Sequence, residues 1–399
     1  MARARRAEPG TAAAPWYGRL LSPGRAAAGG AGLRAVGRRA VMAGRADLRP
    51  ACRPPRESPV QTDRAAQQTA EDVTAYLEPA LREAVGRLSL PVRRMAEYHF
   101  GWVDADGRPS VPVGFRRRPA LLALLCAGSS RAAWDAVRTA AVAGTLLSAA
   151  GTVHDDIGDR EMVRKGRPTL WNAVGVPSAI QVGVALHCLA FELLAAEPGE
   201  AARELARRAA FAVRECCSGQ ILDLEGEGSS RMSLPAAQRL LESTIAMPTA
   251  GVCVVGAVVR GASEDEVAAA ERFGYHAGMA MAYFDDWEGV WGTSRDDLED
   301  AFADLRRRKA RAFAAFALQS RGPARDQLAA YYDDTAEPGP DGLRRVAALV
   351  EECGGRAWLE ERIREHAEAA LRELPEAVPD PAARAELARF VRAITAEVG

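Results

Sequence analysis

The chain is nearly without lysine. Only Lys165 and Lys309 accompany its many arginines, a preference typical of a GC-rich genome, so the two retained lysines are candidates for a specific role. The chain also has no excess of either charge, since 52 basic and 53 acidic residues leave a formal net charge of −1. This balance gives no reason to expect a nucleic-acid partner, which usually requires a basic excess or patch.

Long apolar runs and metal-type cysteine spacings are absent as well. No stretch reaches the roughly 18–20 apolar residues that a membrane-spanning helix needs, so we expect no membrane span. The seven cysteines include no CxxC or comparable spacing, which argues against a zinc site and a disulfide framework. We expect buried free thiols and a cytoplasmic location.

Helical periodicity dominates what is present. From about residue 66 to the end, apolar residues recur at helical spacing, and no alternating strand pattern interrupts them. Residues 133–156 and 178–197 are apolar on most faces, which is typical of helices at the centre of a bundle. We predict one all-α domain over residues 66–399. Residues 1–65, rich in Arg, Ala, Gly and Pro, are predicted to be a disordered extension or a stretch preceding the true start.

Two of these apolar helices are predicted to end in aspartate clusters. The first cluster is Asp155, Asp156 and Asp159, and the second is Asp285 and Asp286. Residues four apart share a helix face, so Asp155 and Asp159 should point the same way. One such cluster is commonly a solvated helix end, but two at the ends of buried helices can face each other across the mouth of a bundle. Carboxylate oxygens suit Mg²⁺, and we expect more than one ion.

Positive charge follows the first cluster. Arg164 and Lys165 could bind phosphate oxygens that also contact Mg²⁺, so the predicted ligand is a diphosphate. Mg²⁺ and arginine stabilise a diphosphate leaving group and allow its C–O bond to break. An allylic carbon makes this step feasible because its cation is delocalised, and an apolar pocket without free water would protect that cation.

The motifs together resemble the trans-isoprenyl diphosphate synthase, or polyprenyl synthetase, family. "HDDIGDREMVRKGRPTLW" is similar to its first aspartate-rich motif, "GQILDLEGEG" to its GQxxD motif, and "DDWEGVWG" to its second aspartate-rich motif. "DLRRRKA" is similar to the segment that follows, and the order fits from about residue 90 to 320. The resemblance implies the all-α isoprenoid synthase bundle with a central cavity, an allylic isoprenyl diphosphate substrate, Mg²⁺ and a homodimer.

The resemblance also implies roles for individual residues. Asp155, Asp156, Asp159 and Arg164 are the expected catalytic residues, and the five aspartates of both clusters are the expected metal ligands. Expected diphosphate-binding residues are Arg164, Lys165, Arg118, Gln220 and Lys309. Expected pocket residues are Phe115, Ser148, Ala150, Gly151, Ala282, Tyr283 and Trp287. Ala150 and Gly151 occupy the positions that form the pocket floor in the family, and their small size favours a substrate of C20 or longer.

Several departures from the family pattern lie where isopentenyl diphosphate, the second substrate, binds. Phe115 replaces a lysine, Ser148 a histidine and Ala282 a glutamine, and Thr244–Ile245 stand where the family has a Lys-Thr pair. Losing a charged phosphate contact typically costs about 1.5–3 kcal/mol, so several losses should weaken that site strongly.

Three functions are compatible with this pattern. The departures favour a class I terpene synthase, which ionises the allylic diphosphate and cyclises it without a second substrate. The alternative is a prenyltransferase or chain-elongating synthase that uses isopentenyl diphosphate or another acceptor. A non-catalytic subunit of a synthase is the third, and the intact Asp155, Asp156 and Asp159 argue against it.

Overall fold

The computed structural model describes residues 64–110, 118–292, 302–309, 311–336, 338–396 and 398. The predicted extension therefore lies outside the described residues, apart from its last two positions, which begin the first helix. Phe115 also lies outside them, and Arg118 is described only as the first residue of a helix.

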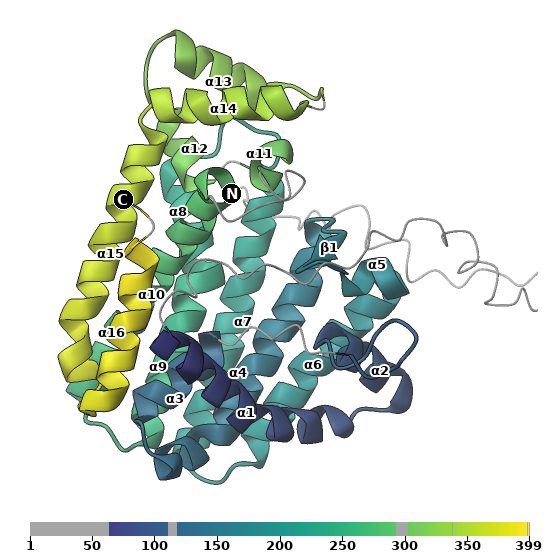
Figure 1. Ribbon diagram of the computed structural model, residues 1–399, viewed down its shortest axis with the longest axis vertical. Helices are drawn as coiled ribbons and strands as arrows, with labels where there is room; N and C mark the ends of the chain where they lie inside the picture. The colour runs from purple at the N-terminus through teal and green to yellow at the C-terminus, as the bar shows by residue number, and fades with distance from the viewer. Residues whose placement is uncertain are drawn as a thin grey trace, which may run out of the picture. The chain divides into compact units, whose positions relative to one another are not determined.

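The described residues are almost entirely helical, which confirms the all-α prediction (Figure 1). The elements are α1 (Arg64–Gly86), α2 (Leu90–His99), α3 (Arg118–Ala127), α4 (Arg131–Gly158), β1 (Val163–Arg164), β2 (Arg167–Pro168), α5 (Leu170–Val174), α6 (Val176–Ala196), α7 (Glu200–Gly226), α8 (Leu234–Leu241), the π-helical turn η3 (Glu242–Ala246), α9 (Met247–Val259), α10 (Glu264–Trp291), α11 (Ala303–Arg306), α12 (Ala312–Ala317), α13 (Pro323–Asp333), α14 (Pro340–Glu352), α15 (Gly355–Ala377) and α16 (Pro381–Ala396).

The core is built around the long helices α4 and α10. α4 packs against α6 and α3, and α10 packs between α9 and α15. Small side chains let α10 approach its neighbours closely, since a Cβ added to Gly278 would lie 2.7 Å from the Cα of Ala246 in η3. A Cβ added to Gly274 would lie 2.6 Å from the Cα of Ala250 in α9. These glycines therefore fix the distance between α10 and the helix that includes η3.

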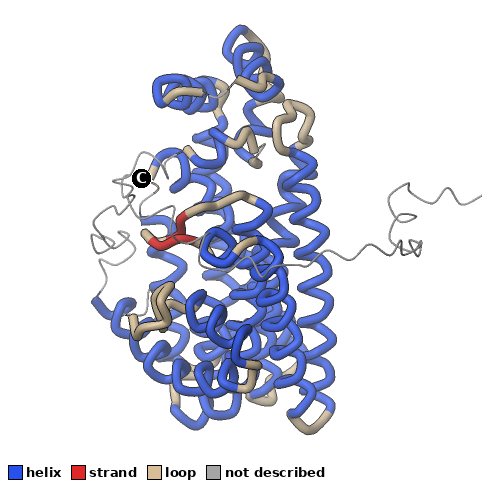
Figure 2. Tube along the Cα trace, turned by 90° about the vertical axis from the view of Figure 1, so that its right-hand side faces the viewer, coloured by secondary structure: helices blue, strands red, loops and turns tan. Residues whose placement is uncertain are grey.

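A short antiparallel hairpin interrupts the helices and is the one feature in the described residues that the periodicity did not predict. β1 pairs with β2, with Arg164 opposite Arg167 (Figure 2). The turn between them is Lys165–Gly166, with φ of 53° and 70°. Two successive residues with positive φ are typical of the tight turn that suits the twist of a hairpin.

Pro248 lies directly after the π-helical turn. Proline lacks an N–H and disturbs the helical hydrogen bonds of the preceding turn, so the sequence predicts a local distortion there. The structure accommodates Pro248 with the wide turn η3, after which α9 continues. Such turns are a common form of irregularity inside long helices.

Three helical stretches are long and apolar enough to cross a membrane by length and composition alone: Arg131–Gly158, Val176–Ala196 and Leu234–Val259. All three pack against other helices of the bundle. The absence of a membrane span therefore remains a prediction.

The cysteines partly match expectation. Cys126 and Cys253 are buried free thiols, as predicted, whereas Cys188 and Cys217 are free but exposed. The exposed thiols were not predicted, and they are weaker support for the predicted reducing compartment than the buried thiols are.

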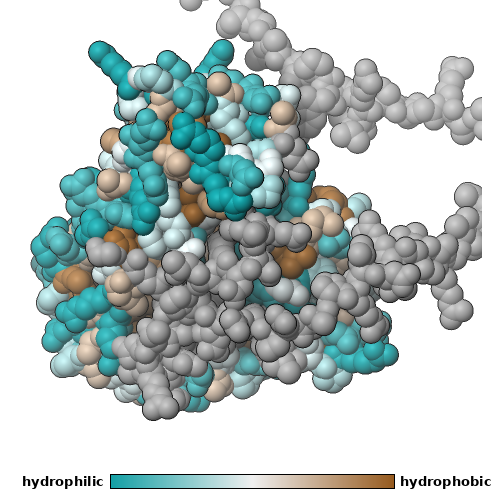
Figure 3. Space-filling model, turned by 45° about the horizontal axis from the view of Figure 1, so that its top comes forward, coloured by the Kyte–Doolittle hydropathy of each residue, from teal (hydrophilic) through white to brown (hydrophobic). Residues whose placement is uncertain are grey.

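α13 and α14 form a helical pair beyond the ends of the central helices (Figure 1). The surface over this pair is mainly hydrophilic, with scattered apolar residues (Figure 3). The buried side of α13 carries Leu328 and Tyr332, each 0% exposed. The pair therefore covers one end of the bundle, and α13 supports the site described next.

Candidate functional site

The first aspartate cluster lies where the sequence predicts it, at the C-terminal end of α4. Asp155 and Asp156 are in the last turn, and Asp159 follows the helix with its N–H still bonded to the Asp155 carbonyl at 2.8 Å. Gln220, from α7, donates from its side-chain nitrogen to Asp155 Oδ1 at 3.0 Å. The GQxxD residue and the first cluster are therefore in direct contact.

The hairpin positions Arg164 over this cluster. Arg164 Nε donates to Asp156 Oδ1 at 2.7 Å, and its Nη2 lies 3.6 Å from Asp155 Oδ2. Lys165 lies exposed at the turn, so the two bases of this pair have different environments. Thr169 and Trp171 both donate to the Glu161 carbonyl, at 2.6 and 2.8 Å, which fixes the loop that leads into the hairpin.

Lys309 joins α4 to α7. Its ammonium lies 2.5 Å from Asp159 Oδ1 and 2.5 Å from Asp223 Oδ2, and its side chain is 2% exposed. The neighbouring Arg307 donates to Glu161 Oε2 at 2.6 Å and lies 3.8 Å from Asp159 Oδ2. The ammonium predicted to bind a diphosphate is therefore occupied by carboxylates of the protein.

The second cluster is joined to the same network by Arg311. The guanidinium makes two bonds to Asp304, at 3.1 and 3.2 Å, and one to Asp223 Oδ1 at 3.2 Å. Its Nε lies 3.8 Å from Asp286 Oδ1. Asp286 is 6% exposed, and its other oxygen, Oδ2, is buried without a hydrogen-bond partner. Arg307, Arg308, Lys309 and Arg311 form one stretch after α11, called the basic segment below, at the same end of the bundle as β1 (Figure 1).

The pKa shifts follow from burial and from the crowding of carboxylates. Burial raises the pKa of Asp286 to about 8, with Arg311 opposing and the charge of Asp304 adding to the increase. Burial and the charge of Asp155 raise the pKa of Asp159 more than Lys309 lowers it. Burial and Arg311 would lower the pKa of Lys309, but the surrounding carboxylates outweigh them and raise it. For Asp159 and Asp286 burial is the largest cause of the rise, whereas the bases around Asp304, Arg311 foremost, outweigh burial and lower the pKa of that carboxyl.

The structure does not bring the two clusters together as one metal-ligand group. Among the described residues, no three or more His, Cys, Asp or Glu side chains are arranged to hold a metal ion. Asp223 and the basic segment separate Asp159 from Asp286. The donors are nonetheless the hard oxygens that Mg²⁺ prefers, and Asp286 Oδ2 is an orphaned buried acceptor. The residue types fit Mg²⁺, and the assignment of the two clusters as its ligands stays a prediction.

The predicted pocket floor lies one to two turns below the first cluster. Ala150 is 0% exposed, and a Cβ added to Gly151 would meet no atom within 4 Å among the groups that surround it. Ser148 is half-buried on the same helix, and Ala282 of α10 is 1% exposed. The open space at Gly151 is consistent with room for a long chain.

The two aromatic pocket candidates contact α8 and α15. The Tyr283 hydroxyl accepts from Gln238, and its ring lies 5.7 Å from the ring of Trp358. Trp287 donates to Glu360 Oε1 at 3.1 Å. These contacts favour helix packing as their role.

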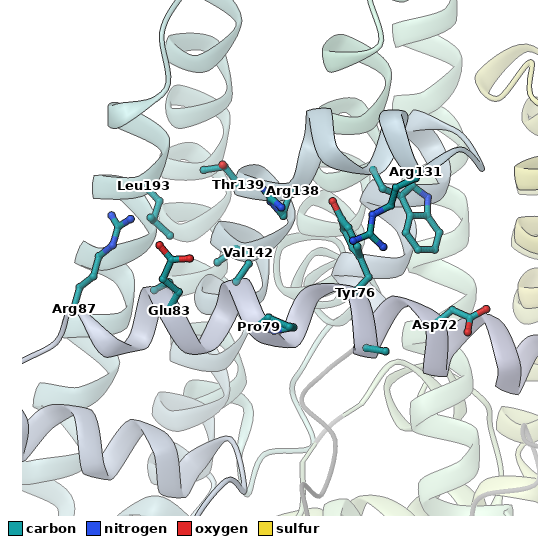
Figure 4. Close-up of a pocket in the computed structure, with 14 residues that line it drawn as sticks. Asp72, Tyr76, Pro79, Glu83, Arg87, Arg131, Arg138, Thr139, Val142 and Leu193 are labelled. Atoms are coloured by element: carbon teal, nitrogen blue, oxygen red, sulfur yellow. The ribbon is translucent and has the colours of Figure 1, made fainter.

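A separate cavity of about 790 Å³ lies at the other end of α4 (Figure 4). Tyr76 of α1, Arg131 and Trp134 of α4, and Leu193 of α6 contribute to its lining. Arg131 and Asp155 are 24 residues apart in one helix, a separation of about 36 Å at 1.5 Å per residue. This cavity is therefore not part of the aspartate site.

Several residues of the network received no role from the sequence, namely Glu161, Asp223, Asp304, Arg307 and Arg311, although the run of bases after the second motif is visible. The retention of Lys309 in an arginine-rich chain was the clearest signal in this region.

Comparison with known proteins is consistent with this geometry. A model of the polyprenyl synthetase family matches residues 109–349. A geranylgeranyl diphosphate synthase of Mycobacterium tuberculosis is 34% identical over 313 residues, covering 78% of this chain and 89% of the relative. A (2E,6E)-farnesyl diphosphate synthase of Mycobacterium bovis is 32% identical over 294 residues, covering 73% and 82%.

Solved structures give the same fold. A polyprenyl synthetase from Streptomyces coelicolor A3(2) superposes with a TM-score of 0.74 at 30% identity and covers 82% of this chain and 99% of that one. A polyprenyl synthase from Caulobacter crescentus CB15 has a TM-score of 0.69 at 21% identity, with 86% and 100% covered.

Proposed function

Because this chain belongs to the polyprenyl synthetase family and is an enzyme, we propose that it is a prenyltransferase that elongates an allylic diphosphate with isopentenyl diphosphate. The alignment with a geranylgeranyl diphosphate synthase over 89% of that relative is the observation that carries the proposal. It supports chain elongation better than the cyclisation that the sequence departures favoured.

The first aspartate cluster is the proposed centre of the reaction. Asp155, Asp156 and Asp159 would hold Mg²⁺, with Asp285 and Asp286 as the second set of ligands. When bound, Mg²⁺ would supply the positive charge that stabilises the departing diphosphate. Carboxylate donors at a helix end that the hairpin and α7 fix from two sides support this assignment.

The chain's own residues provide orientation and charge. Gln220 fixes one oxygen of Asp155 and so sets the direction of the other. Arg164 neutralises Asp156 in the described arrangement, and we propose that it turns to the diphosphate when substrate binds. Lys165 and Arg118 are proposed as further diphosphate contacts. The apolar wall that includes Ala150 and Ala282 would exclude water from the allylic cation.

Cyclisation remains the second candidate because two positions where the family pattern has polar or charged side chains carry no cation in this chain. Ala282 is buried and has no polar group, and the Thr244 hydroxyl donates to the Leu240 carbonyl at 2.7 Å. Neither position provides a cation for a second diphosphate.

One incubation separates the two candidates. Purified protein is given Mg²⁺ and, in separate reactions, an allylic diphosphate of five, ten, fifteen or twenty carbons, with and without isopentenyl diphosphate, and the products are analysed. Longer diphosphates formed only with isopentenyl diphosphate are the expected result. A hydrocarbon or alcohol formed without it would replace elongation by cyclisation. Asp155→Asn should abolish either activity, and retained turnover would contradict the metal-site assignment.

A homodimer is proposed from an exposed apolar surface on α6 and α7. Ile180 and Val184 are 40% and 46% exposed on α6, and Phe211, Ile221 and Leu224 are 42–57% exposed on α7. Exposed apolar residues that gather on neighbouring helices commonly mark a protein interface. A second copy of the chain is the proposed occupant.

Size-exclusion chromatography with light scattering, which gives the molar mass of the eluting protein, tests the proposed dimer. The wild type should elute as a dimer, and Val184→Glu together with Ile221→Glu should shift it towards the monomer. Leu90→Glu is the matched control, since Leu90 is 65% exposed and lies on α2. A monomeric wild type would contradict the proposal.

A further inference from the structure

Arg311 lies within ion-pair distance of Asp286 in the second aspartate cluster. Its guanidinium holds Asp304 with both arms of the fork, bonds Asp223 at 3.2 Å and lies 3.8 Å from Asp286. The side chain is 17% exposed, so these contacts lie largely out of water. A guanidinium stays charged under all ordinary conditions, so a full positive charge always faces Asp286.

The position of Arg311 is fixed by the fold. Arg308, in the basic segment, has φ of 53°, and its side chain is 9% exposed. Its Nε donates to the Tyr331 carbonyl at 2.9 Å, and its Nη2 donates to the carbonyl of Ala336. Tyr332 donates to the Lys309 carbonyl at 3.3 Å. α13 and the turn after it therefore anchor the basic segment from behind.

A metal ion at Asp286 would have to share this carboxylate with Arg311. Two like charges about 4–5 Å apart repel by several kcal/mol at the effective dielectric of a partly buried site. The first cluster differs, because Arg164 comes from a short hairpin and its side chain is 35% exposed. The side chain of Arg311 is only 17% exposed, and two bonds to Asp304 hold it in place.

We propose that Arg311 is an internal cation that competes with metal ions for Asp286, so that the second aspartate cluster takes up metal much more weakly than the first. This inference rests on the proposed function, in which the first cluster holds Mg²⁺. It assigns to Arg311 the position beside the Asp286 carboxylate that a metal ion would otherwise take. The interleaving of bases and carboxylates, which leaves no group of three metal ligands among the described residues, is the expected appearance of such a site.

The affinity of the full-length protein for Mn²⁺, added alone, tests the proposal directly. Binding is measured as the loss of the electron paramagnetic resonance signal of the free ion. Arg311→Met should bind Mn²⁺ at the second cluster at least about tenfold more tightly than the wild type, because a repulsion of several kcal/mol is removed. Adding Asp286→Asn should abolish the gain. Arg344→Met, which removes an exposed arginine paired with Asp341, is the matched control and should leave binding unchanged.

Unchanged or weaker Mn²⁺ binding by Arg311→Met would overturn the proposal. If Arg311→Met does not fold, Asp286→Asn in the wild-type background tests the proposal instead, because asparagine has nearly the same shape as aspartate and should preserve the fold. The proposal expects this variant to keep the wild-type Mn²⁺ stoichiometry, and loss of one ion would overturn it. Asp155→Asn tests the proposed function separately. If it leaves Mn²⁺ binding intact, the first-cluster assignment fails, whatever the Arg311 variants show.

Discussion

Replacing the buried lysine of the site by methionine should destabilise the whole fold. The side chain of Lys309 is 2% exposed and neutralises Asp159 and Asp223, whose side chains are 13% and 9% exposed. Methionine keeps most of the length and packing of lysine and removes only the ammonium. The change therefore isolates the electrostatic contribution of one charge that joins α4 to α7.

The expected cost follows from the partners that remain. Removing one member of a buried ion pair typically costs about 3–5 kcal/mol, because the other charge stays buried without compensation. Asp223 would keep Arg311 at 3.2 Å, and Asp159 would keep Arg307 at 3.8 Å. Each carboxylate thus retains one weaker partner, so we expect a loss of about 3 kcal/mol, at the lower end of that range.

Urea denaturation followed by circular dichroism measures this loss, with Lys165→Met as the matched control. Lys165 is the other lysine of the chain and lies exposed in the hairpin turn, so its replacement should change the free energy of unfolding by less than about 1 kcal/mol. If the two variants unfold at the same urea concentration, the buried ion-pair network does not stabilise the protein and the reasoning is wrong.

Three further predictions address other parts of the molecule. Stability should fall as the pH is lowered from about 6.5 to 4, because burial lowers the pKa of His366 to about 4 and the unfolded chain therefore binds more protons in this window. In a plot of urea midpoint against pH, His366→Gln should flatten this part of the curve relative to the wild type. Gly151→Phe should shorten the longest product made from isopentenyl diphosphate, because the new side chain fills the open space below the aspartates. If chromatography shows an unchanged product length, the growing prenyl chain does not occupy this space. Gly278→Ala should destabilise the fold by about 1–3 kcal/mol, because its Cβ would meet the backbone of η3, whereas Gly289→Ala on the same helix meets nothing within 4 Å and should be neutral in thermal melts.

The helical architecture and the two aspartate clusters could be predicted because local sequence determines them. Apolar periodicity identifies α4 and α10, and Asp155 lies in the last turn of α4 as expected. The second helix was expected to end at Asp286, but α10 continues past it to Trp291. Pairing between distant side chains is different, since Lys309 and Asp159 are 150 residues apart and no periodic pattern connects them. The sequence therefore indicates which charged residues belong to this region, whereas the pairing of Lys309 with two aspartates comes from the structure alone. The diphosphate contact of Lys309 stays a prediction.

The hairpin escaped prediction for a related reason. Each strand has two residues, which is too short for an alternating pattern to be recognised. Its turn at Lys165–Gly166 was the available signal, because glycine readily takes the positive φ that such turns need.

The wide turn η3 changes the phase of the helical stretch that contains it. A π-helical turn contains about one residue more than an α-helical turn, so every side chain that follows is rotated by about 100° relative to a regular helix. Thr244 and Ile245, the positions counted as the missing Lys-Thr pair, lie inside this turn. The helix phase after η3, and not residue number alone, therefore determines which side chains of α9 face the interior of the bundle.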